Sequence, residues 1–343
     1  MVSERFETGR LLALSVILAL ASFSGNARAV DPGERDPANV VGPQECAECH
    51  ENATAIWRNT HHHATFREMP RKEEAIEIAR KMGLRRIKEG SLCLDCHFTS
   101  KIDEEGEPEP IAGISCESCH GAGKGYLEVH SEFSGKKEEE ETAAEEKERW
   151  RKAEQEGMIR PGMMYTWAKN CYSCHVVPEE KLVNKGGHPA GSPFELVAWS
   201  QGEVRHNVWY NEGESNPPAG KNRRRKMFIV GMAVELETAL RAVGEATQKA
   251  DYAVAMAKRA QRARKRFAQA TKLVDGVPAM AEITKVAQGA QLKLNNKGPL
   301  TDAADRIGEL TRQIIADHDG SGMGGIDPAL PGSDDWKGTP SRE

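Results

Sequence analysis

The chain has 343 residues, which accommodates two domains or one domain with a long extension. Aromatic residues make up 6% of the chain and charged residues 29%, so little apolar material is available for an ordinary hydrophobic core. The formal net charge is −5, and the sequence holds no basic stripe with interleaved aromatic residues. This composition excludes nucleic acid as the expected partner and favours a basic protein surface.

The N-terminus has the pattern of an export signal, which we assign to residues 1–29. Arg5 and Arg10 precede an apolar run over residues 11–23, and an Ala-Arg-Ala sequence ends at Ala29. The run is shorter than the roughly 20 apolar residues that span a bilayer. We therefore expect cleavage after Ala29 and a periplasmic mature protein without a membrane span. A retained N-terminal anchor is the alternative.

The cysteines are confined to Cys-x-x-Cys pairs. These are Cys46 with Cys49, Cys93 with Cys96, Cys116 with Cys119, and Cys171 with Cys174. In an exported protein, such cysteines fit disulfides. Two pairs together fit a tetrahedral zinc site, and a single pair fits a thioredoxin-like redox centre.

A histidine follows every pair and separates these alternatives. The four are His50, His97, His120 and His175. Histidine fills only 11 of the 343 positions, so chance does not account for this repetition. Covalent haem attachment requires the histidine, because two thiols bond to the haem vinyl groups and the adjacent imidazole reaches the iron. The motifs therefore predict four covalently bound haem c groups.

Seven further histidines are candidates for the second axial position of each iron. They are His61, His62, His63, His130, His188, His206 and His318. An iron with both axial positions filled is suited to electron transfer, whereas an open position permits ligand binding or chemistry. We expect a continuous helix over residues 51–68, which would place His62 about 18 Å from His50 along the axis. His62 should therefore ligate a different haem from the one attached to Cys46 and Cys49.

The surroundings of the other histidines differ. His130 follows a glycine-rich turn over residues 121–125, which lets the backbone approach a flat ligand closely. His206 ends a helix that we expect over residues 194–206. His188, in a glycine-rich loop before a proline, and His318, between two aspartates, have the settings of surface residues.

Three segments between residues 42 and 210 resemble the tetrahaem cytochrome c-554 family. The Cys46–His50 motif, followed by Trp57, Thr60 and His62, is similar to the first haem segment of that family. The Gly-Ile-Ser-Cys-Glu-Ser-Cys-His sequence at residues 113–120, followed by His130, is similar to its third. Residues 194–206 are similar in spacing to the helix that brings the last distal histidine.

The resemblance implies three axial pairs: His50 with His130, His120 with His62, and His175 with His206. It also implies that the haem attached to Cys93 and Cys96 is ligated by His97 alone and can bind small ligands such as nitric oxide. His61, His63 and His188 are available to fill that position in this chain. The implied partners are a donor resembling hydroxylamine oxidoreductase and a quinone-side or small cytochrome acceptor.

The expected fold is mainly α. A multihaem cytochrome c domain with little regular structure around stacked haems should cover residues 30–210, followed by a linker over residues 211–222. Apolar residues at helical spacing within 223–272, at 277–292 and after Leu300 predict a helical hairpin or three-helix bundle over residues 223–318. This unit should dock onto the haem domain or form a homo-oligomer. The tail over residues 319–343 is expected to be disordered.

These features predict an electron carrier rather than an enzyme. One alternative is a haem reductase that acts on nitric oxide, hydroxylamine or nitrite at the His97 haem. The lack of a fifth haem motif and of a Cys-x-x-Cys-Lys site argues against it. A second alternative is a structural subunit that recruits a redox partner through its helical domain.

Overall fold

The computed structural model describes residues 36–89 and 91–340, so the expected signal sequence lies outside the described residues. The chain is mainly α-helical, which confirms the predicted fold class. Within the described part, helices that are long and apolar enough to cross a membrane are absent.

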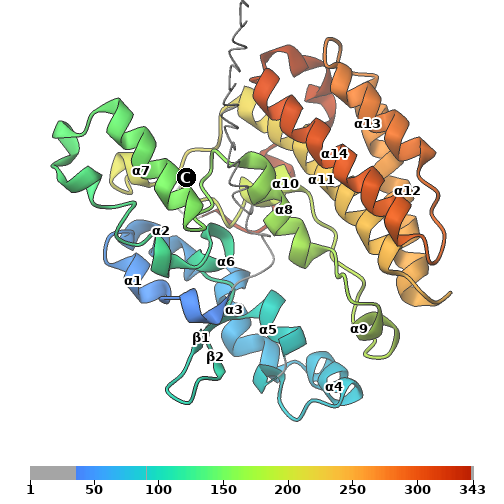
Figure 1. Ribbon diagram of the computed structural model, residues 1–343, viewed down its shortest axis with the longest axis horizontal. Helices are drawn as coiled ribbons and strands as arrows, with labels where there is room; N and C mark the ends of the chain where they lie inside the picture. Colours follow the sequence, from blue (N-terminus) through green and yellow to red (C-terminus); the bar gives the residue numbers. More distant parts are fainter. Residues whose placement is uncertain (1–35, 90, 341–343) are drawn as a thin grey trace, which may run out of the picture.

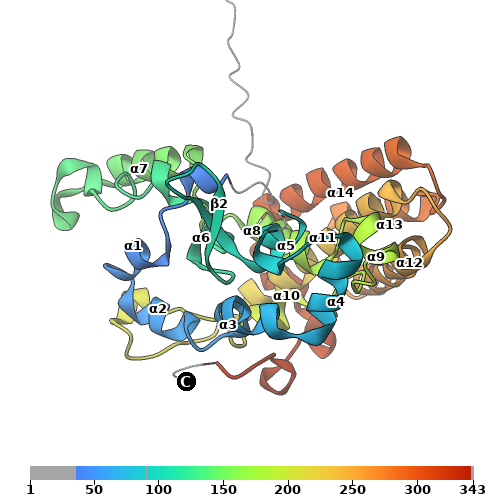
Figure 2. The same cartoon turned by 90° about the horizontal axis from the view of Figure 1, so that it is seen from below.

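The haem-motif segment, residues 36–210, consists of short helices joined by long loops. Its helices are α1 (Pro43–Ala47), α2 (Glu51–Trp57), α3 (His61–Glu68), α4 (Glu73–Met82), α5 (Ser91–His97), α6 (Cys116–His120), α7 (Ala143–Gln155), α8 (Met164–His175), α9 (Glu180–Asn184) and α10 (Leu196–Ser200). Strands β1 (Thr99–Ile102) and β2 (Pro108–Ala112) form an antiparallel hairpin. Figure 1 shows α7 at one end of the long axis and the C-terminal helices at the other, and Figure 2 shows the same separation from below.

The expected continuous helix over residues 51–68 is broken in two. α2 ends at Trp57 and α3 begins at His61. Thr60 takes an extended conformation and its side chain accepts a hydrogen bond from the His63 amide, which is the arrangement of a helix N-cap. Because a new helix begins between His50 and His62, the two residues do not share one straight axis. The distance predicted between them along a continuous helix therefore does not apply.

The C-terminal unit is a bundle of four helices rather than three. They are α11 (Lys221–Glu245), α12 (Asp251–Thr271), α13 (Pro278–Gly289) and α14 (Lys297–Asp317). The proline-free stretch 223–272 is interrupted after α11, where the Ala246 carbonyl oxygen accepts a hydrogen bond from the Asn295 amide. α13 starts on Pro278, whose missing N–H costs nothing at the first helical position.

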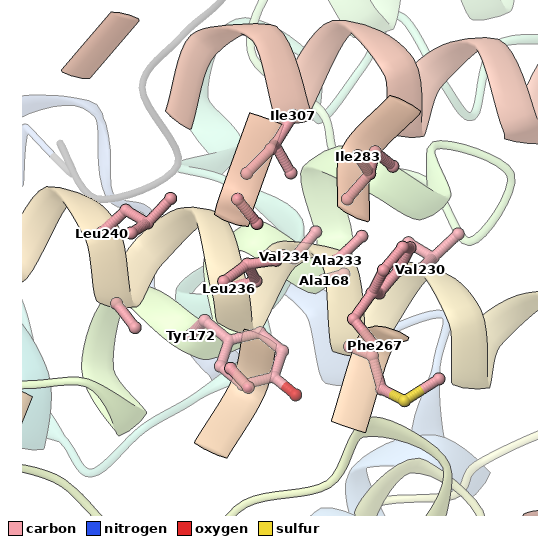
Figure 3. Close-up of a cluster of buried hydrophobic side chains, with 14 of the residues drawn as sticks. Ala168, Tyr172, Val230, Ala233, Val234, Leu236, Leu240, Phe267, Ile283 and Ile307 are labelled. Carbon is pink, nitrogen blue, oxygen red and sulfur yellow. The ribbon is translucent and has the colours of Figure 1, made fainter. Parts of the chain in front are cut away.

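One apolar core joins this bundle to the haem-motif segment. Leu236, Phe267 and Ile307 from three bundle helices are completely buried. Ala168 and Tyr172 of α8 belong to the same cluster (Figure 3). Because α8 carries the fourth haem motif, the bundle packs directly against a haem-binding element. The segments before and after the expected linker, residues 211–222, therefore share one core.

The expected disorder of residues 319–343 is wrong for most of the tail. Residues 321–329 form a 3-10 helix in which Met323 and Ile326 are buried in the bundle core. Further on, the Lys337 amide donates to the Ala198 carbonyl oxygen, and the Lys337 carbonyl oxygen accepts from the Glu203 amide. Two apolar side chains and this backbone pairing hold a segment whose glycine-rich composition suggested disorder.

Candidate haem-binding site

Each Cys-x-x-Cys-His motif lies on a helical turn. The second, third and fourth motifs end α5, α6 and α8, and each helix stops at the histidine of its motif. In the first motif, the His50 amide donates to the Cys46 carbonyl oxygen at 2.9 Å, so the turn continues past the end of α1. Residues three and four positions apart share a helix face. Each motif therefore presents two thiols and an imidazole together.

The cysteines predicted to attach haem differ in their exposure. Cys93 is buried and Cys49 is exposed, whereas the others are half-buried: Cys46, Cys96, Cys116, Cys119, Cys171 and Cys174. The Cys174 sulfur lies 3.9 Å from the Ser173 hydroxyl oxygen, and the Cys46 sulfur lies 4.0 Å from the Gly42 carbonyl oxygen. Contacts of a thiol at such distances are weak, so a bond to a haem vinyl group would cost little to form. Haem attachment at all eight cysteines stays a prediction.

The structure does not support the other uses of cysteine. None of the eight cysteines, all of which lie in the described part of the chain, is joined in a disulfide. Among the residues that the structure describes, no group of three or more histidine, cysteine, aspartate or glutamate side chains is arranged to hold a metal ion. A tetrahedral zinc site needs four such ligands around one centre.

Each motif histidine instead faces one further histidine. The ring centroids are 6.3 Å apart for His50 and His130, 6.2 Å for His97 and His188, 6.0 Å for His120 and His206, and 6.4 Å for His175 and His62.

These spacings fit an iron between two imidazoles. Metal–nitrogen bonds of about 2 Å, with about 1 Å more from each nitrogen to its ring centre, put the two centroids about 6 Å apart. The four distances are nearly equal although they join different segments, which indicates that every pair is spaced for the same kind of centre. A haem c attached through the adjacent thiols would supply a redox-active iron at each position.

Five of these rings also have an oxygen atom within hydrogen-bond distance of Nδ1. Their Nδ1 atoms lie 2.6–2.9 Å from an oxygen in the pairs His120–Ile159, His130–Tyr126, His175–Ser192, His188–Pro189 and His206–Val204. Metal-binding histidines usually donate their other ring N–H to such a group, which orients the ring. A proton on Nδ1 leaves Nε2 with the lone pair that binds iron.

Burial keeps several of the rings neutral. It lowers the pKa of His97, His120 and His175 to about 4. Burial also lowers the pKa of His50 and His62. Because only a neutral imidazole can bind a metal, these side chains are ready for ligation at pH 7.

Two of the expected axial pairs differ from the histidine pairs that the structure brings together. His50 does face His130, but His120 faces His206 rather than His62. His175 faces His62. The expectation that His62 and His50 serve different motifs agrees with this geometry, although the helix on which that argument was based is broken.

The short length of α10 explains the exchange. A helix over residues 194–206 was expected, but α10 ends at Ser200 and the chain turns through Gly202. A side chain at Gly202 would collide with the Lys337 carbonyl oxygen. The turn directs the chain to His120, while the ring of Phe194 stacks on His175 with centroids 4.2 Å apart.

The partner of His97 was missed. Of the three candidates left open, His61 places its Nδ1 2.7 Å from a Glu203 carboxylate oxygen, and His63 packs edge-on against Trp57. His188 is the one that faces His97. A signal was present, since two glycines precede His188 just as a glycine-rich turn precedes His130.

Comparison with known proteins points to the same chemistry. A family model described as cytochrome c554 and c-prime matches residues 45–121, which contain the first three motifs. This part of the haem-motif segment is therefore similar to the cytochrome c554 family. Cytochrome c-554 of Nitrosomonas europaea (strain ATCC 19718) is 25% identical over 170 residues, which cover 47% of this chain.

The match covers 66% of that relative, slightly less than two thirds of its length. No solved structure matches the chain. These similarities support covalently bound haem c in this chain. The bundle helices α11–α14 lie outside the residues that the family model matches.

Proposed function

We propose that the protein is a periplasmic tetrahaem cytochrome c that carries electrons between redox partners. The observation that carries this proposal is the set of four histidine pairs, each next to a Cys-x-x-Cys pair and spaced for one iron. An iron held by two histidines has no free position for a substrate, so its chemistry is electron exchange. The similarity of residues 45–121 to the cytochrome c554 family agrees with that role.

Contacts between the motifs support a row of haems. The Cys46 and Cys116 thiols lie close enough to shift each other's pKa, so the first and third sites are neighbours. Asn170 of α8 donates to the Ser118 and Cys119 carbonyl oxygens, which links the third site to the fourth.

The second site adjoins the fourth. Phe66 of α3, the helix that carries His62, packs edge-on against Phe98 at the end of the second motif. His97 is also close enough to His175 to contribute to its lowered pKa, after burial, His62 and Arg259. We infer the order second, fourth, third, first, so that the second and first haems end the row.

Haem content and spin state test this function. The holoprotein, exported with its own N-terminus by a host that attaches haem c, should begin at Val30 and contain four haems by mass. Electron paramagnetic resonance of the oxidised protein should show low-spin iron only, and all four haems should reduce and reoxidise reversibly. Fewer covalent haems, or turnover of nitric oxide or hydroxylamine, would contradict an electron carrier with four haems.

A cysteine variant tests the attachment itself. Replacing Cys49, Cys96 or Cys174 with alanine removes one of the two thioether bonds at the first, second or fourth site. Each haem should then remain attached through the other cysteine of its motif, and its reduced absorption band should shift to longer wavelength. An unchanged spectrum in any of the three variants would show that the replaced cysteine carries no haem.

We further propose that a basic redox protein docks at the first haem. The Trp209 ring lies 4.6 Å from the His50 ring and is 56% exposed, and Tyr210 beside it is 99% exposed. Exposed carboxylates flank this site within a few residues of His50, His130 or Trp209: Glu48, Glu51, Glu128, Glu132, Glu212 and Glu214. Exposed aromatic side chains surrounded by like charges favour a partner with a lysine-rich face.

Neutralising this acidic surface should slow electron transfer. In the triple variant Glu48→Gln, Glu51→Gln, Glu212→Gln, the second-order rate constant with a lysine-rich small cytochrome should fall about tenfold at low ionic strength. The salt dependence of the rate should weaken as well. The control variant Asp275→Asn, Asp302→Asn, Asp317→Asn removes the same charge from the bundle, and equal slowing in both variants would rule out docking at the first haem.

A further inference from the structure

The residues that follow the fourth motif form a closed loop. Val176 and Gly191 pair as an antiparallel bridge, and the Val177 amide donates to the Ala190 carbonyl oxygen at 3.2 Å. α9 lies within this loop, and His188 lies on the segment between α9 and the bridge residue Gly191. The backbone at both ends of the loop is therefore held where it leaves the fourth haem motif.

His188 occupies a defined position in this loop. Its amide donates to the Leu182 carbonyl oxygen, and its Nδ1 lies 2.7 Å from the Pro189 carbonyl oxygen. Gly187 has a φ of 79°, which favours glycine. A side chain at Gly186 would collide with the Leu182 carbonyl oxygen. The double glycine thus forms the turn that brings the His188 ring to 6.2 Å from His97.

The bundle holds the other side of this loop. The Glu180 carboxylate accepts hydrogen bonds from the Thr247 amide and hydroxyl and from the Gln248 amide, at 2.6–3.2 Å. The Asn184 side-chain oxygen accepts from the Tyr252 amide at 2.9 Å. Both acceptors belong to α9, and all the donors lie between α11 and the first turn of α12.

We propose that His188 is the second axial ligand of the haem attached to Cys93 and Cys96 and that the C-terminal bundle positions it. This inference rests on the proposed haem attachment and deepens it. With His188 in place, all four irons are six-coordinate and the second haem has no open position. The bundle then serves the redox centre by anchoring α9, and His188 is a ligand that the resemblance to the c-554 family does not provide.

Spectroscopy of a ligand variant tests the first half of the proposal. In haem-loaded His188→Gly protein, one of the four haems should become high-spin in the oxidised state and bind nitric oxide, and added imidazole should restore the low-spin signal. His318→Gly, which removes a histidine from the end of α14, should leave four low-spin haems. If the glycine variant does not fold, His188→Met supplies a thioether ligand and should stay low-spin with an altered absorption spectrum.

The outcomes separate this inference from the proposed function. A wild-type protein with four covalent haems, one of them high-spin, would overturn the role of His188 and leave the electron carrier intact. Four low-spin haems in His188→Gly would likewise overturn the role of His188 and leave the electron carrier intact. A protein without covalent haem would instead refute the proposed function itself.

A positioning variant tests the second half. Glu180→Ala removes the acceptor for Thr247 and Gln248 without touching a histidine. It should increase the rate at which cyanide enters the second haem on the order of tenfold, because groups that orient a metal ligand affect metal binding by about this factor. Lys181→Ala, on the neighbouring exposed residue, is the control. Equal cyanide rates in the two variants would show that the bundle does not position His188.

Discussion

Replacing Arg259 with leucine is expected to destabilise the folded protein by about 3–5 kcal/mol, because it leaves a buried carboxylate without its main partner. The Arg259 Nε atom lies 3.1 Å from a carboxylate oxygen of Glu235, and both side chains are almost buried. The second cation near Glu235 is Arg266, at 3.3 Å, which is 44% exposed and compensates less.

The same substitution should disturb the fourth haem. The Arg259 Nη1 atom donates to the His175 and Ser192 carbonyl oxygens, both at 3.1 Å. Ser192 in turn contacts the His175 ring at Nδ1. Gly191 has no side chain, and a Cβ there would come within 2.7 Å of this guanidinium. We therefore expect the low-spin signal of the fourth haem to broaden or shift in Arg259→Leu.

Denaturant unfolding of the holoprotein measures the stability change. Arg262→Leu is the matched control, because Arg262 is exposed on the same helix and its replacement should change the free energy of unfolding by less than about 0.5 kcal/mol. Equal midpoints for the two variants would mean that the Arg259–Glu235 pair adds nothing to stability. An unchanged low-spin signal in Arg259→Leu would show that Arg259 does not influence the fourth haem.

The motifs could be predicted from the sequence because their chemistry is local. Two thiols and an imidazole for one haem come from five consecutive residues, such as Cys116–His120. Helical spacing of apolar residues likewise predicted helices within residues 223–272 and after Leu300, and these segments form bundle helices whose residues Leu236 and Ile307 are buried. Local patterns of this kind are complete within one or two helical turns.

The partners of His97, His120 and His175 could not be predicted, because each pair joins segments whose approach depends on the whole fold. His206 reaches His120 because α10 stops early, and it stops where the tail residue Lys337 packs against Gly202. His188 reaches His97 because α9 is anchored on a bundle that the family resemblance did not cover. Contacts between segments far apart in the sequence determine both outcomes.

Removing His62 and His206 one at a time should distinguish the histidine pairs of the structure from the axial pairs first expected. Each replacement by alanine should make one of the four haems high-spin, which is a loss of about a quarter of the low-spin iron. The structure assigns the affected haem to the fourth motif in His62→Ala and to the third in His206→Ala. The expected pairs would assign them the other way round.

The angle between ligand planes identifies the haem that changes. The rings of His120 and His206 are 85° apart, whereas those of His175 and His62 are 46° apart and those of His50 and His130 are 12° apart. Nearly perpendicular imidazoles give a strongly anisotropic low-spin signal with a large maximum g value, and nearly parallel ones give a rhombic signal. His206→Ala should therefore abolish the most anisotropic signal, and His62→Ala should preserve it.

His63→Ala is the control for the neighbouring histidine, because its ring packs on Trp57 and faces no other imidazole among the described pairs. It should keep all four low-spin signals. The opposite result, with the anisotropic signal lost in His62→Ala and kept in His206→Ala, would contradict the pairing of His120 with His206. The inferred order of the haems rests on the proximity of Cys46 to Cys116 and on the Asn170 hydrogen bonds, and neither depends on which distal histidine binds which iron.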